Sequence, residues 1–119
     1  MLTQYKKEYE KTAMGFLSYL PDFKNFQNLK QEMSIYCHDN DFQLYLFSES
    51  GHHFLGVIGI QIEKEVIMIR YLSLAPGFRN KVEQDKIITD LQNLFPSKML
   101  MTVPDYSFLL KDVKHHHDN

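Results

Sequence analysis

The stretch that decides the fold reads Ile69-Arg70-Tyr71-Leu72-Ser73-Leu74-Ala75-Pro76-Gly77-Phe78-Arg79-Asn80-Lys81-Val82-Glu83-Gln84. It is mostly apolar as far as Leu74, a proline turn follows at Pro76, and apolar residues take helical spacing after Arg79. The first N–H groups of a helix have no partner within the helix and carry partial positive charge, so anions bind well there. The stretch therefore predicts a strand that runs through a turn into a helix, an arrangement suited to a phosphate-bearing ligand.

The spacing of apolar residues also predicts the elements in the rest of the chain. Alternating apolar residues predict strands, and apolar residues three and four positions apart predict helices. Prolines and polar clusters mark the element ends, and either Asp22 or Asn25 is expected to cap the second helix. The expected order is β-α-α-β-β-β-α-β-α, with elements at Met1–Tyr5, Tyr9–Leu20, Phe26–Cys37, Phe42–Phe47, Phe54–Ile62, Val66–Leu74, Arg79–Phe95, Met99–Val103 and Tyr106–Val113.

This order predicts a single α+β domain over residues 1–113, in which helices pack on a mixed sheet, and a solvated tail over residues 114–119. The net charge of −2 and the pI near 6.3 argue against nucleic acid as a partner. No stretch approaches the roughly 20 apolar residues of a membrane span, so we expect a cytoplasmic protein. Cys37, the only cysteine, is expected to be buried, and neither it nor His115–His117 predicts a metal site.

Two glycines and one arginine stand out within the apolar strands. Gly56 and Gly59 indicate a bulge or the close approach of another backbone. Regular alternation places Arg70 on one strand face with Val66, Met68, Leu72 and Leu74, and places Tyr71 and Ser73 on the other. A charge on an apolar face needs a partner. Arg70 is expected either to pair with an acidic group or the chain terminus, or to contact a substrate.

The motif Leu72-x-Leu74-x-Pro76-x-x-Arg79 resembles the fourth strand and pyrophosphate loop of the GNAT superfamily of acetyl-CoA-dependent acetyltransferases. Tyr5-Lys6-Lys7, Ala13-Met14-Gly15 and the short length resemble more closely the small GNAT-type proteins encoded in bacterial riboflavin operons. The resemblance implies a mostly antiparallel mixed sheet, shortened at the C-terminus. It also implies acetyl transfer from acetyl-CoA to a small-molecule amine, and a homodimer.

Carried over by position, the implied coenzyme site consists of Leu72, Ser73, Leu74, Arg79, Asn80, Lys81, Val82, Glu83 and Gln84. The family's loop has glycines where this chain has Val82 and Gln84, and glycine lets a phosphate approach the backbone closely. Glu83 and Asp85 are expected to add negative charge near the ligand, which costs about 1 kcal/mol per pair in water and ~4 near a protein surface. The sequence therefore predicts weak acetyl-CoA binding.

The implied catalytic positions are altered too. The position of a general-base glutamate on the fourth strand holds Met68, and the tyrosine of the final helix aligns with Leu109. Tyr106 lies three positions earlier and, with Arg70, is a candidate catalytic residue.

Two functions follow from these observations. The first is an N-acetyltransferase of weak activity with a degenerate coenzyme loop, associated with riboflavin metabolism. The second is a catalytically inactive module that keeps the fold and binds a partner protein or another metabolite. Because enzymes of this kind can act mainly by holding the reactants together, the altered side chains do not decide between the two.

Overall fold

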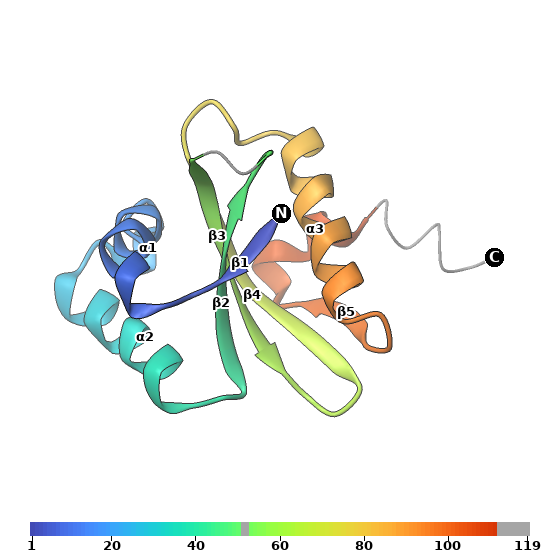
Figure 1. Ribbon diagram of the computed structural model, residues 1–119, viewed down its shortest axis with the longest axis horizontal. Coiled ribbons are helices and arrows are strands. Elements are labelled where there is room, and N and C mark those ends of the chain that lie inside the picture. Colours follow the sequence, from blue (N-terminus) through green and yellow to red (C-terminus); the bar gives the residue numbers. More distant parts are fainter. Residues whose placement is uncertain (51–52, 112–119) are drawn as a thin grey trace.

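The computed structural model describes residues 1–50 and 53–111, in which one mixed sheet carries helices on both faces (Figure 1). In this part of the chain the strand order is β1-β2-β3-β4-β5, antiparallel except for the parallel pair β4 and β5. This confirms the expected α+β fold with a mostly antiparallel sheet. The elements are β1 Leu2–Gln4, η1 Lys7–Tyr9, α1 Glu10–Leu17, η2 Pro21–Phe23, α2 Phe26–His38, β2 Phe42–Ser48, β3 Phe54–Ile62, β4 Val66–Leu74, α3 Lys81–Leu94, β5 Met99–Thr102 and η3 Pro104–Leu110.

Most element boundaries agree with the sequence. The cap of α2 is Asn25, whose side chain accepts hydrogen bonds from the N–H groups of Gln27 and Asn28. The last expected helix differs: it is a 3-10 helix that begins at Pro104, whose fixed φ suits a first helical position. Part of the expected range 106–113, and the tail 114–119, lie outside the described residues.

Two layers of core enclose the sheet. Helices α1 and α2 cover one face, and α3 covers the other (Figure 1). Strand β3 is buried on both faces, as its apolar sequence predicts, since Val57 packs toward α1 and α2 and Ile58 packs toward α3. Cys37 is exposed, contrary to expectation, because the buried stripe of α2 runs through Leu29, Glu32 and Met33. No helix in the described ranges is long and apolar enough to cross a membrane.

A β-bulge interrupts β4 at Arg70. Gly59 pairs with Tyr71 and Ile60 pairs with Ile69, so Arg70 has no opposite residue on β3. The extra residue reverses the alternation beyond it. Ile67 and Ile69 before the bulge, and Leu72 and Leu74 after it, therefore all pack on the α3 side.

The expected assignment of side chains to the two faces of β4 is therefore wrong in part. Arg70 does not share a face with Leu72 and Leu74, and Tyr71 does not point away from Arg70. Both Arg70 and Tyr71 reach the same residue of α2, Glu32. A regular strand would send consecutive side chains to opposite faces.

Strands β4 and β5 separate at the same place. Their pairing runs from Val66 opposite Met99 to Ile69 opposite Thr102, and the Val103 N–H donates to the Ile69 carbonyl at 3.1 Å. Beyond this bond the chain turns into η3. The second half of β4, from Arg70 to Leu74, therefore has no β5 partner along that edge.

Gly59 lies opposite the bulge and has no room for a side chain. A Cβ atom there would lie 2.6 Å from the Tyr36 hydroxyl and would also collide with the Tyr71 ring. The predicted close approach at Gly59 is thus one of side chains to the backbone. Gly15 in α1, in contrast, has nothing within 4 Å of the corresponding position.

We expect Gly59→Ala to lower the free energy of unfolding by about 1–3 kcal/mol, because the added methyl overpacks the contact with Tyr36 and Tyr71. Gly15→Ala serves as the control and should raise the free energy of unfolding by roughly 0.5–1 kcal/mol, since alanine has a higher helix propensity than glycine at an exposed position. Urea unfolding followed by circular dichroism measures both. Equal effects of the two substitutions would contradict the packing around Gly59.

Candidate active site

A groove opens where β4 and β5 separate. It encloses about 270 Å³, with β4 on one side, η3 on the other, and the start of α3 at one end. Its lining consists of Tyr19, Leu20, Leu72, Ser73, Leu74, Arg79, Gln84, Tyr106 and Phe108. The β4 residues of this lining belong to the half of the strand that β5 leaves unpaired.

A second cavity of about 680 Å³ adjoins the groove. Leu20, Tyr106 and Phe108 line both, so these side chains stand between the two spaces. The remaining lining of the larger cavity is Pro21, Asp22, Phe23, Arg70, Tyr71, Val103 and Asp105. Its walls are thus largely apolar and aromatic, with two carboxylates and the Arg70 guanidinium among them.

Part of the predicted coenzyme site lines the groove, namely Leu72, Ser73, Leu74, Arg79 and Gln84. Arg79 donates from Nε to the Leu74 carbonyl at 2.8 Å, and its guanidinium lies 4.8 Å from the centre of the Tyr19 ring. The Ser73 hydroxyl donates to the Phe16 carbonyl at 2.6 Å. These bonds join the end of β4 to the start of α3 and to α1.

Apart from Gln84, the first turn of α3 lies outside the groove lining. The Asn80 side chain caps the helix and accepts a hydrogen bond from the Glu83 N–H at 3.0 Å. Lys81 pairs with Asp85 at 2.7 Å, and Val82 is 63% exposed. Of the two positions where the family has glycine, the one whose side chain lines the groove is therefore Gln84.

The acidic residues of α3 also lie outside the groove lining. Glu83 is buried against Glu49 and Lys86, with 3.6 Å between Lys86 Nζ and its carboxylate. The hydrogen bond with the Glu49 carboxyl, together with burial, raises the pKa of Glu83. A lysine lies beside each of Glu83 and Asp85. These carboxylates therefore repel an anion in the groove less strongly than the sequence predicts.

Tyr106, not Leu109, faces the groove. Leu109 is 3% exposed and packs in the core on the α3 side, so a tyrosine at its position would point away from the open strand edge. Burial raises the pKa of the Tyr106 phenol, a hydrogen bond with the Leu72 main chain opposes this shift, and the Asp22 and Asp105 carboxylates raise the pKa further. The phenol is therefore protonated at neutral pH and is able to donate a proton.

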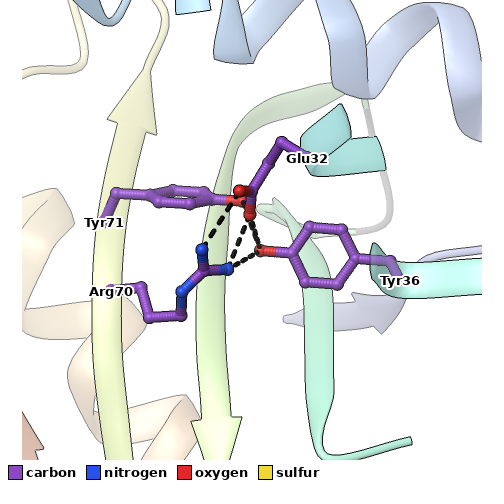
Figure 2. A network of polar contacts seen from close by, with 4 residues as sticks. All are labelled: Glu32, Tyr36, Arg70 and Tyr71. Carbon is purple, nitrogen blue, oxygen red and sulfur yellow. Dashed lines mark hydrogen bonds and ion pairs between the residues drawn. The ribbon is translucent and has the colours of Figure 1, made fainter. Parts of the chain in front are cut away.

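Beside the groove, four side chains meet at the bulge (Figure 2). The Glu32 carboxylate accepts hydrogen bonds from Arg70 at 2.6 and 3.0 Å, from the Tyr71 hydroxyl at 2.7 Å and from the Tyr36 hydroxyl at 2.7 Å. Arg70 also donates to the Tyr36 hydroxyl at 2.9 Å, and the two tyrosine hydroxyls contact each other. The expected pairing of Arg70 with an acidic side chain is confirmed, and the partner is Glu32.

This network is largely shielded from solvent. The Glu32 side chain is 7% exposed, and the Arg70 side chain is 21% exposed and stacks on the Phe42 and Tyr71 rings. Burial has the largest single effect on the pKa of Glu32 and raises it, because burial disfavours the charged form. The hydrogen bonds from Arg70, Tyr71 and Tyr36 together outweigh burial, so the pKa is lowered. Burial also raises the pKa of Tyr71, so this phenol stays protonated as a donor.

Sequence reasoning did not identify Glu32 or Asp22 as site residues. A signal for Glu32 existed, because an acidic residue stands within the apolar stripe of Leu29, Met33 and Tyr36. For Asp22 there was none beyond its capping potential. Its place in the larger cavity depends on how η2 approaches β4 and η3, which local spacing does not reveal.

Similarity to known proteins supports this fold. No protein-family model matches the chain. A relative from Bacillus methanolicus, an uncharacterized N-acetyltransferase in the lysA 3′ region, is 34% identical over 102 residues, covering 85% of this chain and 84% of the relative. The chain therefore belongs to the N-acetyltransferases, and its fold is that of the GNAT acetyltransferases.

Two solved structures support the fold assignment. AAC(6′)-Iy in complex with the bisubstrate analogue CoA-S-monomethyl-acetylneamine has a TM-score of 0.70 at 12% identity, covering 99% of this chain and 87% of that one. Spermidine N-acetyltransferase from Vibrio cholerae, in complex with CoA and spermine, has a TM-score of 0.59 at 12% identity, covering 78% and 61%. At these identities the likeness concerns the fold alone.

The Glu32 network predicts a pH dependence of stability. Because the folded pKa of Glu32 lies below its ordinary value of 4.5, the unfolded chain binds a proton first as the pH falls. This contribution to stability is present above about pH 4.5 and is lost as the pH falls through the folded pKa. We expect the wild type to lose more free energy of unfolding than Glu32→Gln between about pH 5 and pH 3.

Urea unfolding at a series of pH values measures this difference, and the exposed Glu8, substituted as Glu8→Gln, is the control that should keep the wild-type profile. Parallel profiles for the wild type and Glu32→Gln would show that Glu32 has no lowered pKa.

Proposed function

We propose that this chain binds acetyl-CoA in the groove beside β4 and transfers the acetyl group to a small-molecule amine in the adjoining cavity. The observation that carries the proposal is the end of β4–β5 pairing at Ile69, which leaves the Leu72–Leu74 edge of β4 without a partner strand beside Arg79. Family membership supports it, as do the CoA complexes of AAC(6′)-Iy and spermidine N-acetyltransferase.

Acetyl-CoA, when bound, supplies a thioester and a diphosphate. An open strand edge offers N–H and C=O groups to an extended, amide-containing arm, as in the addition of a strand to a sheet. Arg79 offers a planar guanidinium suited to phosphate oxygens. The residues in the groove thus fit the two ends of such a ligand.

Tyr106 is proposed as the general acid. A neutral amine would attack the thioester carbonyl, the carbon–sulfur bond would break, and the leaving thiolate would take the phenolic proton of Tyr106. The Tyr106 phenolate would then regain a proton from solvent. The amine proton passes to solvent or to a neighbouring carboxylate, with Asp22 and Asp105 in the same cavity. Holding the two reactants together supplies much of the rate enhancement in such a reaction.

The acceptor is proposed to be a small amine. Arg70, the cation in this lining, is paired with Glu32. The two carboxylates and the aromatic walls of the larger cavity therefore favour a molecule that is cationic in solution. We propose weak activity, because Gln84 occupies groove space where the family's loop has glycine. A link to riboflavin metabolism remains a prediction that rests on the resemblance alone.

The alternative is a non-catalytic binding module. Two contacts favour it: Asn80 occupies the Glu83 N–H at the start of α3, and Tyr106 occupies a main-chain group of Leu72. In both cases the protein itself satisfies a group that a ligand would otherwise use. Under this alternative, acetyl-CoA does not bind, and another metabolite or a partner protein takes its place.

Calorimetry with acetyl-CoA separates the two functions. We expect measurable binding by the wild type, and binding about tenfold weaker by Arg79→Met, because a charge-assisted hydrogen bond is worth about 1.5–3 kcal/mol. Lys30→Met removes the same charge from the exposed surface of α2 and should leave the affinity unchanged. No heat at millimolar acetyl-CoA would remove the acetyltransferase proposal.

Val82 and Gln84, the two positions where the family has glycine, provide a matched pair of substitutions. We expect Gln84→Gly to tighten acetyl-CoA binding by roughly tenfold, about 1.4 kcal/mol, by clearing the groove. Val82→Gly carries the same helix cost and should not tighten binding, because Val82 points to solvent. If Gln84→Gly binds no more tightly than the native chain, then Gln84 does not obstruct the groove.

A further inference from the structure

The bulge and the opening of the groove occur at one residue. Pairing of β4 with β5 ends at Ile69, and the next residue, Arg70, is the one that lacks a partner on β3. A bulge bends its strand and increases the local twist. The direction of the β4 main chain beyond Arg70, and hence the shape of the groove, therefore depends on keeping the bulge in place.

The groups that hold the bulge come from α2. Arg70 and Tyr71 are consecutive, yet both donate to the Glu32 carboxylate, as Figure 2 shows. In a regular strand one of the two would face the α3 side. Only the bulged register satisfies Glu32 with both donors.

We infer that Glu32 is a positioning residue for the proposed reaction: by holding Arg70 and Tyr71 on the α2 side, it fixes the direction of the Leu72–Leu74 main chain that lines the groove. Glu32 lines neither the groove nor the larger cavity, so it acts through β4 and not by touching a ligand there. The kinetic consequence rests on the proposed function, whereas the effect on β4 does not.

The alternative register is unfavourable for a physical reason. A slip of one residue would withdraw Arg70 or Tyr71 from a carboxylate whose side chain is 7% exposed. Breaking a buried ion pair leaves an uncompensated charge, which costs far more than an exposed pair is worth. Gly59 acts in the same direction, because the Tyr71 ring lies over it where a side chain would otherwise stand.

The test is Glu32→Gln, which keeps the shape of residue 32 and removes its charge. Two measurements are made: the backbone amide NMR shifts of residues 70–74, and the acetyl-CoA affinity by calorimetry. We expect large shift changes at Arg70–Leu74, small ones in β1, and acetyl-CoA affinity at least tenfold weaker.

The control is Tyr45→Phe, which removes the hydroxyl that donates to Gln43 on the other side of the sheet. It should lower the stability and leave both the β4 amides and the affinity unchanged. If Glu32→Gln does not fold, Tyr71→Phe replaces it, with the same changes expected at smaller size.

Unchanged β4 amide shifts in Glu32→Gln would overturn the inference. An acetyl-CoA affinity of Glu32→Gln that is no weaker than that of Tyr45→Phe would overturn it too. If the wild type does not bind acetyl-CoA, the proposed function fails, and the amide shifts alone then decide whether Glu32 positions β4.

Discussion

The ion pair between Glu32 and Arg70 joins α2 to the sheet at the point where β4 bends. A buried carboxylate is tolerated only with a full set of donors, and here Arg70, Tyr71 and Tyr36 supply them. Two of these donors, Arg70 and Tyr71, are neighbours in β4. Both can reach the Glu32 carboxylate only in the bulged register. In that register the residues Leu72–Leu74 lie along the groove, and Tyr106 of η3 belongs to the same lining.

Much of the fold could be predicted from local spacing. The bounds of β3 and β4 follow from apolar runs that end at turns, and the start of α2 follows from the capping side chain of Asn25. The candidate site was harder to predict. The pair Gly59 and Arg70 contained the signal for the bulge, but regular alternation was assumed through Arg70, and this assumption put Leu72 and Leu74 on the wrong face. Tertiary contacts, not strand propensity, decided the outcome.

The coenzyme loop shows a similar limit of position-by-position reasoning. Val82 and Gln84 both replace glycine, yet one side chain points to solvent and the other lines the groove. Glu83 and Asp85 looked unfavourable for a diphosphate, but each lies beside a lysine away from the groove lining. In the final segment, Leu109 matches the family's tyrosine by position but is buried in the core, whereas Tyr106 lines the groove. The direction of each side chain, rather than its place in a motif, decides what it does.

Under the proposed function, acetyl-CoA binds along the edge of β4 that β5 leaves without a partner strand. Residue-resolved hydrogen exchange of the native protein, with and without acetyl-CoA, tests it most directly. We expect acetyl-CoA to slow exchange at Leu72–Leu74 and around Arg79, while the amides of β1, at the opposite edge of the sheet from β5, remain unaffected. Protection confined to other segments, with the β4 amides exchanging as before, would contradict it.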